Sequence, residues 1–127
     1  MDADVKTLLD LQTWAVVGLS QDRSRAAYGV AQFLQARGRR IVPVHPKAEE
    51  VHGEPGYARL ADLPFPVDVV DCFVNSRLVG PVVDEAIAAG AKGVWMQLGV
   101  VDQAAAARAR DAGLTVVMDR CPKIEWR

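Results

Sequence analysis

Short apolar runs alternate with longer amphipathic segments along the chain, and no repeat or low-complexity tract interrupts the alternation. The apolar runs resemble buried parallel strands, and the amphipathic segments have the period of helices that cover a sheet. This pattern predicts one α/β domain over residues 1–127, a single Rossmann-like three-layer α/β/α sandwich whose five-stranded parallel sheet has the order 3-2-1-4-5. We expect strands at residues 14–17, 40–44, 68–74, 93–96 and 114–117, and helices at 5–11, at 26–37, from a cap at Asn75 or Ser76 to residue 89, and from a cap at Asp102 to Gly113.

The third of these strands is nearly all apolar and β-branched, as a central parallel strand should be. The connection before it, residues 45–66, is rich in proline and glycine and is expected to hold at most one short helical turn, around residues 60–62. Long connections inside compact domains often carry function.

Four strand ends are expected at one edge of the sheet. With the order 3-2-1-4-5, the chain reverses direction across the sheet between the first and fourth strands, and open α/β sheets bind ligands at the carboxyl ends of strands beside such a switch point. The segments that should meet there are residues 18–25, 43–47, 73–77 and 97–99.

The first two of these segments lack two features of a nicotinamide dinucleotide site. Such a site has three glycines in its first turn and an acidic residue after its second strand. Here the turn has only Gly18, and the second strand is followed by the cation Lys47. Backbone amides of residues 19–23, the Ser20 hydroxyl and the cations Arg23, Arg25 and Lys47 predict a ligand with more than one phosphate.

Each of these features also has a simpler explanation. Arg23 and Arg25 are either phosphate ligands or solvated loop charges, Asn75 is either a ligand contact or only a helix cap, and Gln97 is either a ligand contact or a loop amide. The expected convergence on one edge favours the binding interpretation.

Charge and composition exclude several classes of function. The formal net charge of −1 gives no reason to expect nucleic acid or an anionic membrane as partner, and no apolar stretch reaches the roughly 18 residues that span a bilayer. We expect a cytosolic protein with Cys72 and Cys121 reduced, and no metal site or catalytic triad. Neither His45 nor His52 is expected to be catalytic.

Several motifs, in order, resemble those of a known family. They are Val16-Val17-Gly18-Leu19-Ser20, Arg25 and Tyr28 before Val30-Ala31, Ile41-Val42-Pro43-Val44-His45-Pro46, and Val94-Trp95-Met96-Gln97-Leu98-Gly99-Val100. Over residues 13–125 the chain looks like the small stand-alone CoA-binding proteins, which are similar to the N-terminal CoA-binding domain of the succinyl-CoA synthetase α subunit.

The resemblance implies a Rossmann-like domain that binds coenzyme A. A cation after the second strand suits the 3′-phosphate of this ligand. By resemblance, the loop after the first strand would hold the phosphates, the segment after the second strand would border the adenosine, and the later segments would line the pantetheine path. The candidate binding residues are Gly18, Leu19, Ser20, Gln21, Asp22, Arg23, Arg25, Pro43, Val44, His45, Pro46, Lys47, Phe73, Asn75, Gln97, Leu98 and Gly99.

We expect a binding or regulatory module for coenzyme A or an acyl-CoA, with no catalysis of its own. The alternatives are the CoA-binding component of an acyl-CoA ligase, which needs a partner chain, and an NAD-dependent oxidoreductase domain. Trp95 and Trp126 either anchor a homodimer or cap the core. Cys121 is either a structural thiol or the site of a mixed disulfide with coenzyme A.

Overall fold

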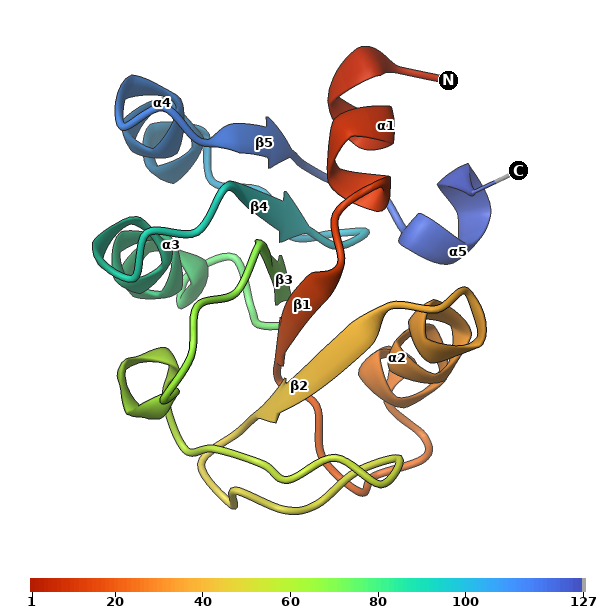
Figure 1. Cartoon of the computed structure of the whole chain (residues 1–127). Coiled ribbons are helices and arrows are strands. Elements are labelled where there is room, and N and C mark those ends of the chain that lie inside the picture. The colour runs from red at the N-terminus through yellow and green to blue at the C-terminus, as the bar shows by residue number, and fades with distance from the viewer. Residues whose placement is uncertain (127) are drawn as a thin grey trace.

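A five-stranded parallel sheet lies at the centre of the computed structural model, which describes residues 1–126, and helices cover both of its faces (Figure 1). The α/β class and the five parallel strands are therefore confirmed. The strands are β1 (Thr13–Val17), β2 (Arg40–Val44), β3 (Val69–Cys72), β4 (Gly93–Met96) and β5 (Thr115–Val117). The helices are α1 (Ala3–Leu9), α2 (Ala26–Ala36), the 3-10 turn η1 (Leu60–Asp62), α3 (Val79–Ala88), α4 (Gln103–Asp111) and the short α5 (Pro122–Glu125), which the sequence pattern did not predict.

The sheet separates two apolar layers (Figure 1). On one face α1, α2 and α5 pack over Trp14 and Trp95, which have no exposed surface and whose ring centroids lie 5.7 Å apart. On the other face α3, α4 and η1 pack over the apolar side chains of the same strands. Trp95 is therefore a core residue and offers no surface to a second copy of the chain. Trp126 packs edge-on against Phe33 of α2, with centroids 6.1 Å apart.

The predicted strand order 3-2-1-4-5 is wrong, because the observed order is β2-β1-β3-β4-β5. The long connection occupies the outer edge of β2: the Tyr57 amide donates to the Pro43 carbonyl, and the His45 amide donates to the Tyr57 carbonyl, each at 3.0 Å. Asp68 then fastens the start of β3 to β1, since its Oδ2 accepts from the Thr13 amide at 3.1 Å. The switch point therefore lies between β1 and β3.

One of the two predicted helix caps is present in the structure. Asp102 caps α4 as predicted, because its Oδ1 accepts a first-turn amide at 2.9 Å. The cap predicted at Asn75 or Ser76 is wrong, since α3 begins further along the chain and has no side-chain cap. Ser76 Oγ instead donates to the Gly99 carbonyl at 3.1 Å and accepts from the Val101 amide at 2.9 Å. It thereby joins the loops that follow β3 and β4.

One ionisable side chain lies inside the sheet. Asp71 of β3 sits in register between Val16 of β1 and Trp95 of β4 and has no exposed surface. Burial disfavours its charged form and raises the pKa of Asp71 from 3.8 to about 8, although a hydrogen bond from Gln97 acts in the opposite direction. At neutral pH the Asp71 carboxyl is therefore largely uncharged.

Gly18→Ala is expected to lower the free energy of unfolding by about 2 kcal/mol or more. Gly18 has φ +103°, and a Cβ there would lie 2.4 Å from the Phe73 carbonyl oxygen. Gly29→Ala is the matched control, because Gly29 lies in α2 with ordinary φ and open space around it, and alanine there should stabilise by about 0.5–1 kcal/mol. Urea denaturation measures both values. Equal stability of Gly18→Ala and wild type would contradict the inference that the backbone conformation and close contact at residue 18 require glycine.

The stability difference between wild type and Asp71→Asn is expected to depend on pH. Between pH 4 and about 8 the folded Asp71 holds a proton that the unfolded chain has released, so the wild type loses stability as pH rises through this window. Relative to Asp71→Asn, which cannot titrate, the loss should approach about 1.4 kcal/mol per pH unit at most. The measurement is a series of denaturation experiments on both proteins at pH 5 to 9. If the Asp71 pKa were ordinary, the stabilities of wild type and Asp71→Asn would change with pH in parallel.

Candidate functional site

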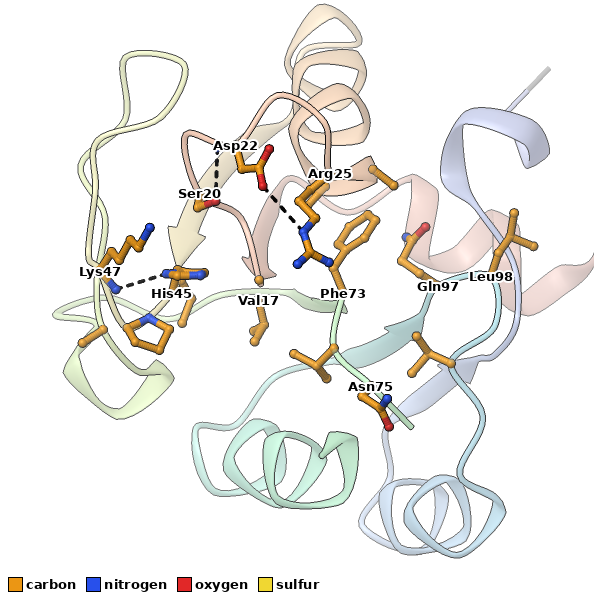
Figure 2. Close-up of a pocket in the computed structure, with 18 residues that line it drawn as sticks. Val17, Ser20, Asp22, Arg25, His45, Lys47, Phe73, Asn75, Gln97 and Leu98 are labelled. Atoms are coloured by element: carbon orange, nitrogen blue, oxygen red, sulfur yellow. Dashed lines mark hydrogen bonds and ion pairs between the residues drawn. The ribbon is translucent and has the colours of Figure 1, made fainter. Parts of the chain in front are cut away.

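A cavity of about 730 Å³ opens at the carboxyl ends of the strands (Figure 2). Its walls come from the ends of β1, β2, β3 and β4 and from the first turn of α2. It therefore lies over the β1/β3 switch point, where open α/β sheets bind ligands. The structure brings twelve of the candidate binding residues to its wall: Gly18, Ser20, Asp22, Arg25, Val44, His45, Pro46, Lys47, Phe73, Asn75, Gln97 and Leu98.

Five candidates do not line this cavity. Leu19 is 1% exposed and belongs to the core on the α2 face of the sheet. The Arg23 guanidinium lies over the Tyr28 ring, 5.8 Å from its centroid, and not on the cavity wall. The others are Gln21, Pro43 and Gly99.

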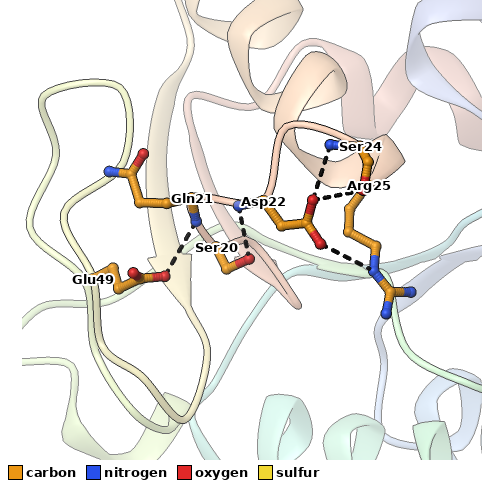
Figure 3. Close-up of polar contacts among 6 residues, drawn as sticks. All are labelled: Ser20, Gln21, Asp22, Ser24, Arg25 and Glu49. Carbon is orange, nitrogen blue, oxygen red and sulfur yellow. Dashed lines mark hydrogen bonds and ion pairs between the residues drawn. The ribbon is translucent and has the colours of Figure 1, made fainter.

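The loop after β1 is shaped by its own side chains (Figure 3). Ser20 Oγ accepts from the Asp22 amide at 3.2 Å, and Asp22 Oδ1 accepts from the amide and the hydroxyl of Ser24 at 3.0 and 2.6 Å. These Ser24 bonds, and then the charges of Arg25 and Lys47, hold the pKa of Asp22 below its ordinary value against a small opposing effect of burial. Asp22 Oδ2 also lies 3.7 Å from Arg25 Nε, which restrains this guanidinium beside the cavity.

A strap formed by residues 45–57 lies against this loop. The Gln21 amide donates to Glu49 Oε1 at 3.2 Å, and the Gln21 side chain donates to the Glu50 carbonyl. Further along the strap, His52 Nε2 donates to the Tyr28 carbonyl at 2.8 Å. His52 is therefore an anchor of the strap on α2, and Gln21 serves the same purpose from the loop.

Two cations reach the cavity from separate elements. Arg25 comes from the start of α2 and Lys47 from the strap, and both line the cavity. Figure 2 shows Lys47 beside His45 and Arg25 beside Phe73. No side chain caps the first turn of α2, and Ala26 and Ala27 of this turn line the cavity. His45 Nδ1 accepts from the Lys47 amide at 3.1 Å, which puts the proton of neutral His45 on Nε2.

The cavity wall also has apolar side chains. Phe73, Leu98 and Val100 line the cavity together with the amides of Asn75 and Gln97. Figure 2 shows Gln97 and Leu98 on the side away from Lys47. Leu98 is 56% exposed, whereas Gln97 is 5% exposed. The cavity thus runs from Lys47 at one end, past Arg25 and Phe73, to Gln97 and Leu98 at the other (Figure 2), and its two cations suit anionic oxygens.

Neither cysteine lies on the cavity wall. Burial, and to a lesser extent the Asp71 carboxyl, raises the pKa of the Cys72 thiol, so Cys72 is unreactive core packing. Cys121 is a half-buried free thiol that packs against the core on the α2 face. Within residues 1–126, no group of three or more His, Cys, Asp or Glu side chains could hold a metal ion, and no helix is both long and apolar enough to cross a bilayer.

Sequence reasoning missed Asp71 and Glu49. Asp71 lies directly behind the cavity wall, because its Oδ1 accepts from Gln97 Nε2 at 2.6 Å. A lone carboxylate in an otherwise apolar central strand is a signal that could have identified it, since such a group is costly to bury. Glu49 gave no such signal, because its contact with Gln21 depends on the path of the strap.

Comparisons with known proteins agree with this architecture. The family model described as CoA binding domain matches residues 12–127. "Uncharacterized protein YneT" of Bacillus subtilis is 32% identical over 123 residues, which are 96% of this chain and 91% of that protein. A solved structure of a "hypothetical protein from Pyrococcus horikoshii OT3" is 37% identical, with a TM-score of 0.92 over 98% of this chain and 89% of the other.

Larger enzymes contain a similar domain. The chain is 32% identical over 81 residues to the α subunit of the ADP-forming acetate–CoA ligase II of Pyrococcus furiosus, covering 63% of this chain but only 18% of that subunit. The dinucleotide-forming acetyl-coenzyme A synthetase 1 of Ca. Korarchaeum cryptofilum, solved with phosphate and ADP, is 26% identical, with a TM-score of 0.78 over 91% of this chain and 27% of that one. A family match from residue 12 onward, together with a relative of similar length, establishes that this chain belongs to the CoA-binding domain family.

Proposed function

We propose that this protein binds coenzyme A or an acyl-CoA in the strand-end cavity and acts as a binding or regulatory module without catalysis of its own. The observation that carries the proposal is that Arg25 and Lys47, from two separate elements, line the same cavity as the uncapped start of α2. Phosphates are the groups that such a combination binds best. The family match makes coenzyme A the phosphate-bearing ligand of choice.

The residues after β2 argue against an NAD-dependent oxidoreductase. From Val44 to Lys47 there is no carboxylate to accept from a ribose 2′-hydroxyl. Lys47 would instead attract the 3′-phosphate that coenzyme A carries on its ribose. The end of the cavity away from Lys47, with Gln97 and Leu98, would receive the pantetheine arm.

A second candidate function is the CoA-binding part of an acyl-CoA ligase that needs another chain. It is favoured by the likeness to the acetate–CoA ligase α subunit, of which this chain spans less than a fifth, and by the exposed Leu78, Leu98 and Val101 on the loops after β3 and β4. Formation of acetyl-CoA on mixing the protein with an ATP-grasp subunit, acetate, coenzyme A and Mg-ATP would support this role. Both free thiols agree with a cytoplasmic location, which we include in the proposal.

Calorimetric titration should separate the roles of the two cations. We expect Lys47→Ala to weaken coenzyme A binding about tenfold and dephospho-CoA binding much less, because Lys47 would hold the 3′-phosphate. Arg25→Ala should weaken both ligands by similar factors of about ten, because the pyrophosphate is common to them. Wild-type protein should bind coenzyme A more tightly than NAD.

Arg23→Ala is the matched control, since Arg23 belongs to the same loop but lies over Tyr28 outside the cavity. It should leave all affinities within about twofold of wild type. Binding of NAD but not of coenzyme A by the wild type would overturn the proposal. Loss of coenzyme A affinity in Arg23→Ala equal to that in Arg25→Ala would move the phosphate site toward Arg23 and Tyr28.

A further inference from the structure

Asp71 is a fully buried carboxyl group that the fold does not need. It has no exposed surface, it forms no ion pair with any residue from 1 to 126, and its Oδ2 has no hydrogen-bond partner among them. An unpartnered buried oxygen costs stability, and an apolar β-branched residue would suit this strand better. A residue that opposes the stability of its own strand points to a role outside folding.

The one hydrogen bond of the Asp71 carboxyl leads to the cavity. Gln97 follows β4 and is nearly buried, yet it lines the cavity wall. Its Nε2 donates to Asp71 Oδ1 at 2.6 Å, while none of the hydrogen bonds within residues 1–126 uses its Oε1. Within residues 1–126, Asp71 Oδ2 is the one side-chain oxygen or nitrogen that is both fully buried and without a hydrogen-bond partner. Gln97 Oε1 also has no partner there, so it must have some exposed surface. Asp71 therefore leaves the carbonyl end of the Gln97 amide available as an acceptor.

We propose that Asp71 is a positioning residue that holds the Gln97 amide so that its carbonyl oxygen accepts a hydrogen bond from the pantetheine arm of the ligand. This inference rests on the proposed function. In Figure 2, Gln97 and Leu98 lie far from His45 and Lys47, with Phe73 and Arg25 between them. A ligand whose phosphates are held by Lys47 and Arg25 therefore extends its arm toward Gln97. The donors on that arm are its pantoyl hydroxyl, its two amide N–H groups and its terminal S–H.

The uncharged state of Asp71 suits this arrangement. With its pKa raised to about 8, the carboxyl accepts from Gln97 at neutral pH without adding a negative charge behind a site for phosphates. An ionised carboxylate would bind the Gln97 amide more strongly but would repel the anionic ligand. A purely apolar residue would leave the Gln97 amide free to turn and present its N–H₂ group instead.

The test compares coenzyme A with adenosine 3′,5′-bisphosphate, which has no arm, in calorimetric titrations of Asp71→Val. We expect coenzyme A affinity to fall about fivefold to tenfold while adenosine 3′,5′-bisphosphate affinity stays unchanged. The melting temperature should rise at the same time, because the unpartnered carboxyl is gone. Asp71→Asn keeps an acceptor for Gln97 Nε2 and should restore most of the coenzyme A affinity.

A double-mutant cycle tests whether Asp71 acts through Gln97. Gln97→Leu alone should weaken coenzyme A binding at least as much as Asp71→Val does, and the double variant should be no weaker than Gln97→Leu. Additive losses would overturn the inference. Acetyl-CoA narrows the choice of donor: insensitivity of acetyl-CoA binding to Asp71→Val assigns the S–H, and a loss equal to that of coenzyme A assigns the pantoyl O–H or an amide N–H.

Failure of this inference is distinguishable from failure of the proposed function. Absence of coenzyme A binding by the wild type overturns the function itself. Wild-type binding that Asp71→Val leaves unchanged, or equal losses for coenzyme A and adenosine 3′,5′-bisphosphate, overturns the role of Asp71 alone. Asp71→Ala adds no bulk to the strand and gives the same ligand comparison if Asp71→Val does not fold.

Discussion

The pairing of β3 with β1 is the constraint on which the rest of this structure depends. Because Tyr57 and the strap occupy the outer edge of β2, β3 pairs on the inner side of β1, where Asp68 fastens its first residues. The chain therefore leaves β1 and β3 toward opposite faces of the sheet, and their carboxyl ends open into one cavity. The strap that enforces this order also carries Lys47 to the cavity rim, so topology and ligand chemistry come from the same segment.

The charge of the cavity arises from local placement rather than from the net charge of −1. Asp22 and Glu49 bring carboxylates into the same neighbourhood as the cations, but both are engaged by the loop: Asp22 by Ser24 and Arg25, and Glu49 by the Gln21 amide. These contacts hold the loop in shape while the start of α2 stays uncapped. Since Arg25 is largely exposed, its contribution to binding should be screened by salt more strongly than that of the backbone amides.

The sequence predicted the features that depend on the local pattern of residues, namely the strands, one helix start and most of the cavity wall. Apolar runs located all five strands, Asp102 identified the start of α4, and the strand ends contained most of the residues that line the cavity. The strand order failed because it depends on one backbone pairing of Tyr57 with β2, which leaves no mark in hydrophobic periodicity. The cap predicted at Ser76 failed for a related reason, since its hydroxyl bonds across to the loop after β4. Arg23 shows that loop membership alone does not say which way a side chain points.

Asp71 is visible both in the local sequence pattern and in a contact between distant segments of the chain. In the sequence it is a single departure from an apolar strand, and the structure turns it into a link from the centre of the sheet to the Gln97 amide. If folding alone selected this position, an apolar residue would serve better, because half of the carboxyl has no partner within residues 1–126. Loops at the cavity rim can vary their shape, but an amide held from beneath by a rigid central strand keeps its orientation. A buried group that weakens the fold while orienting a residue of the cavity wall is best explained by what the cavity binds.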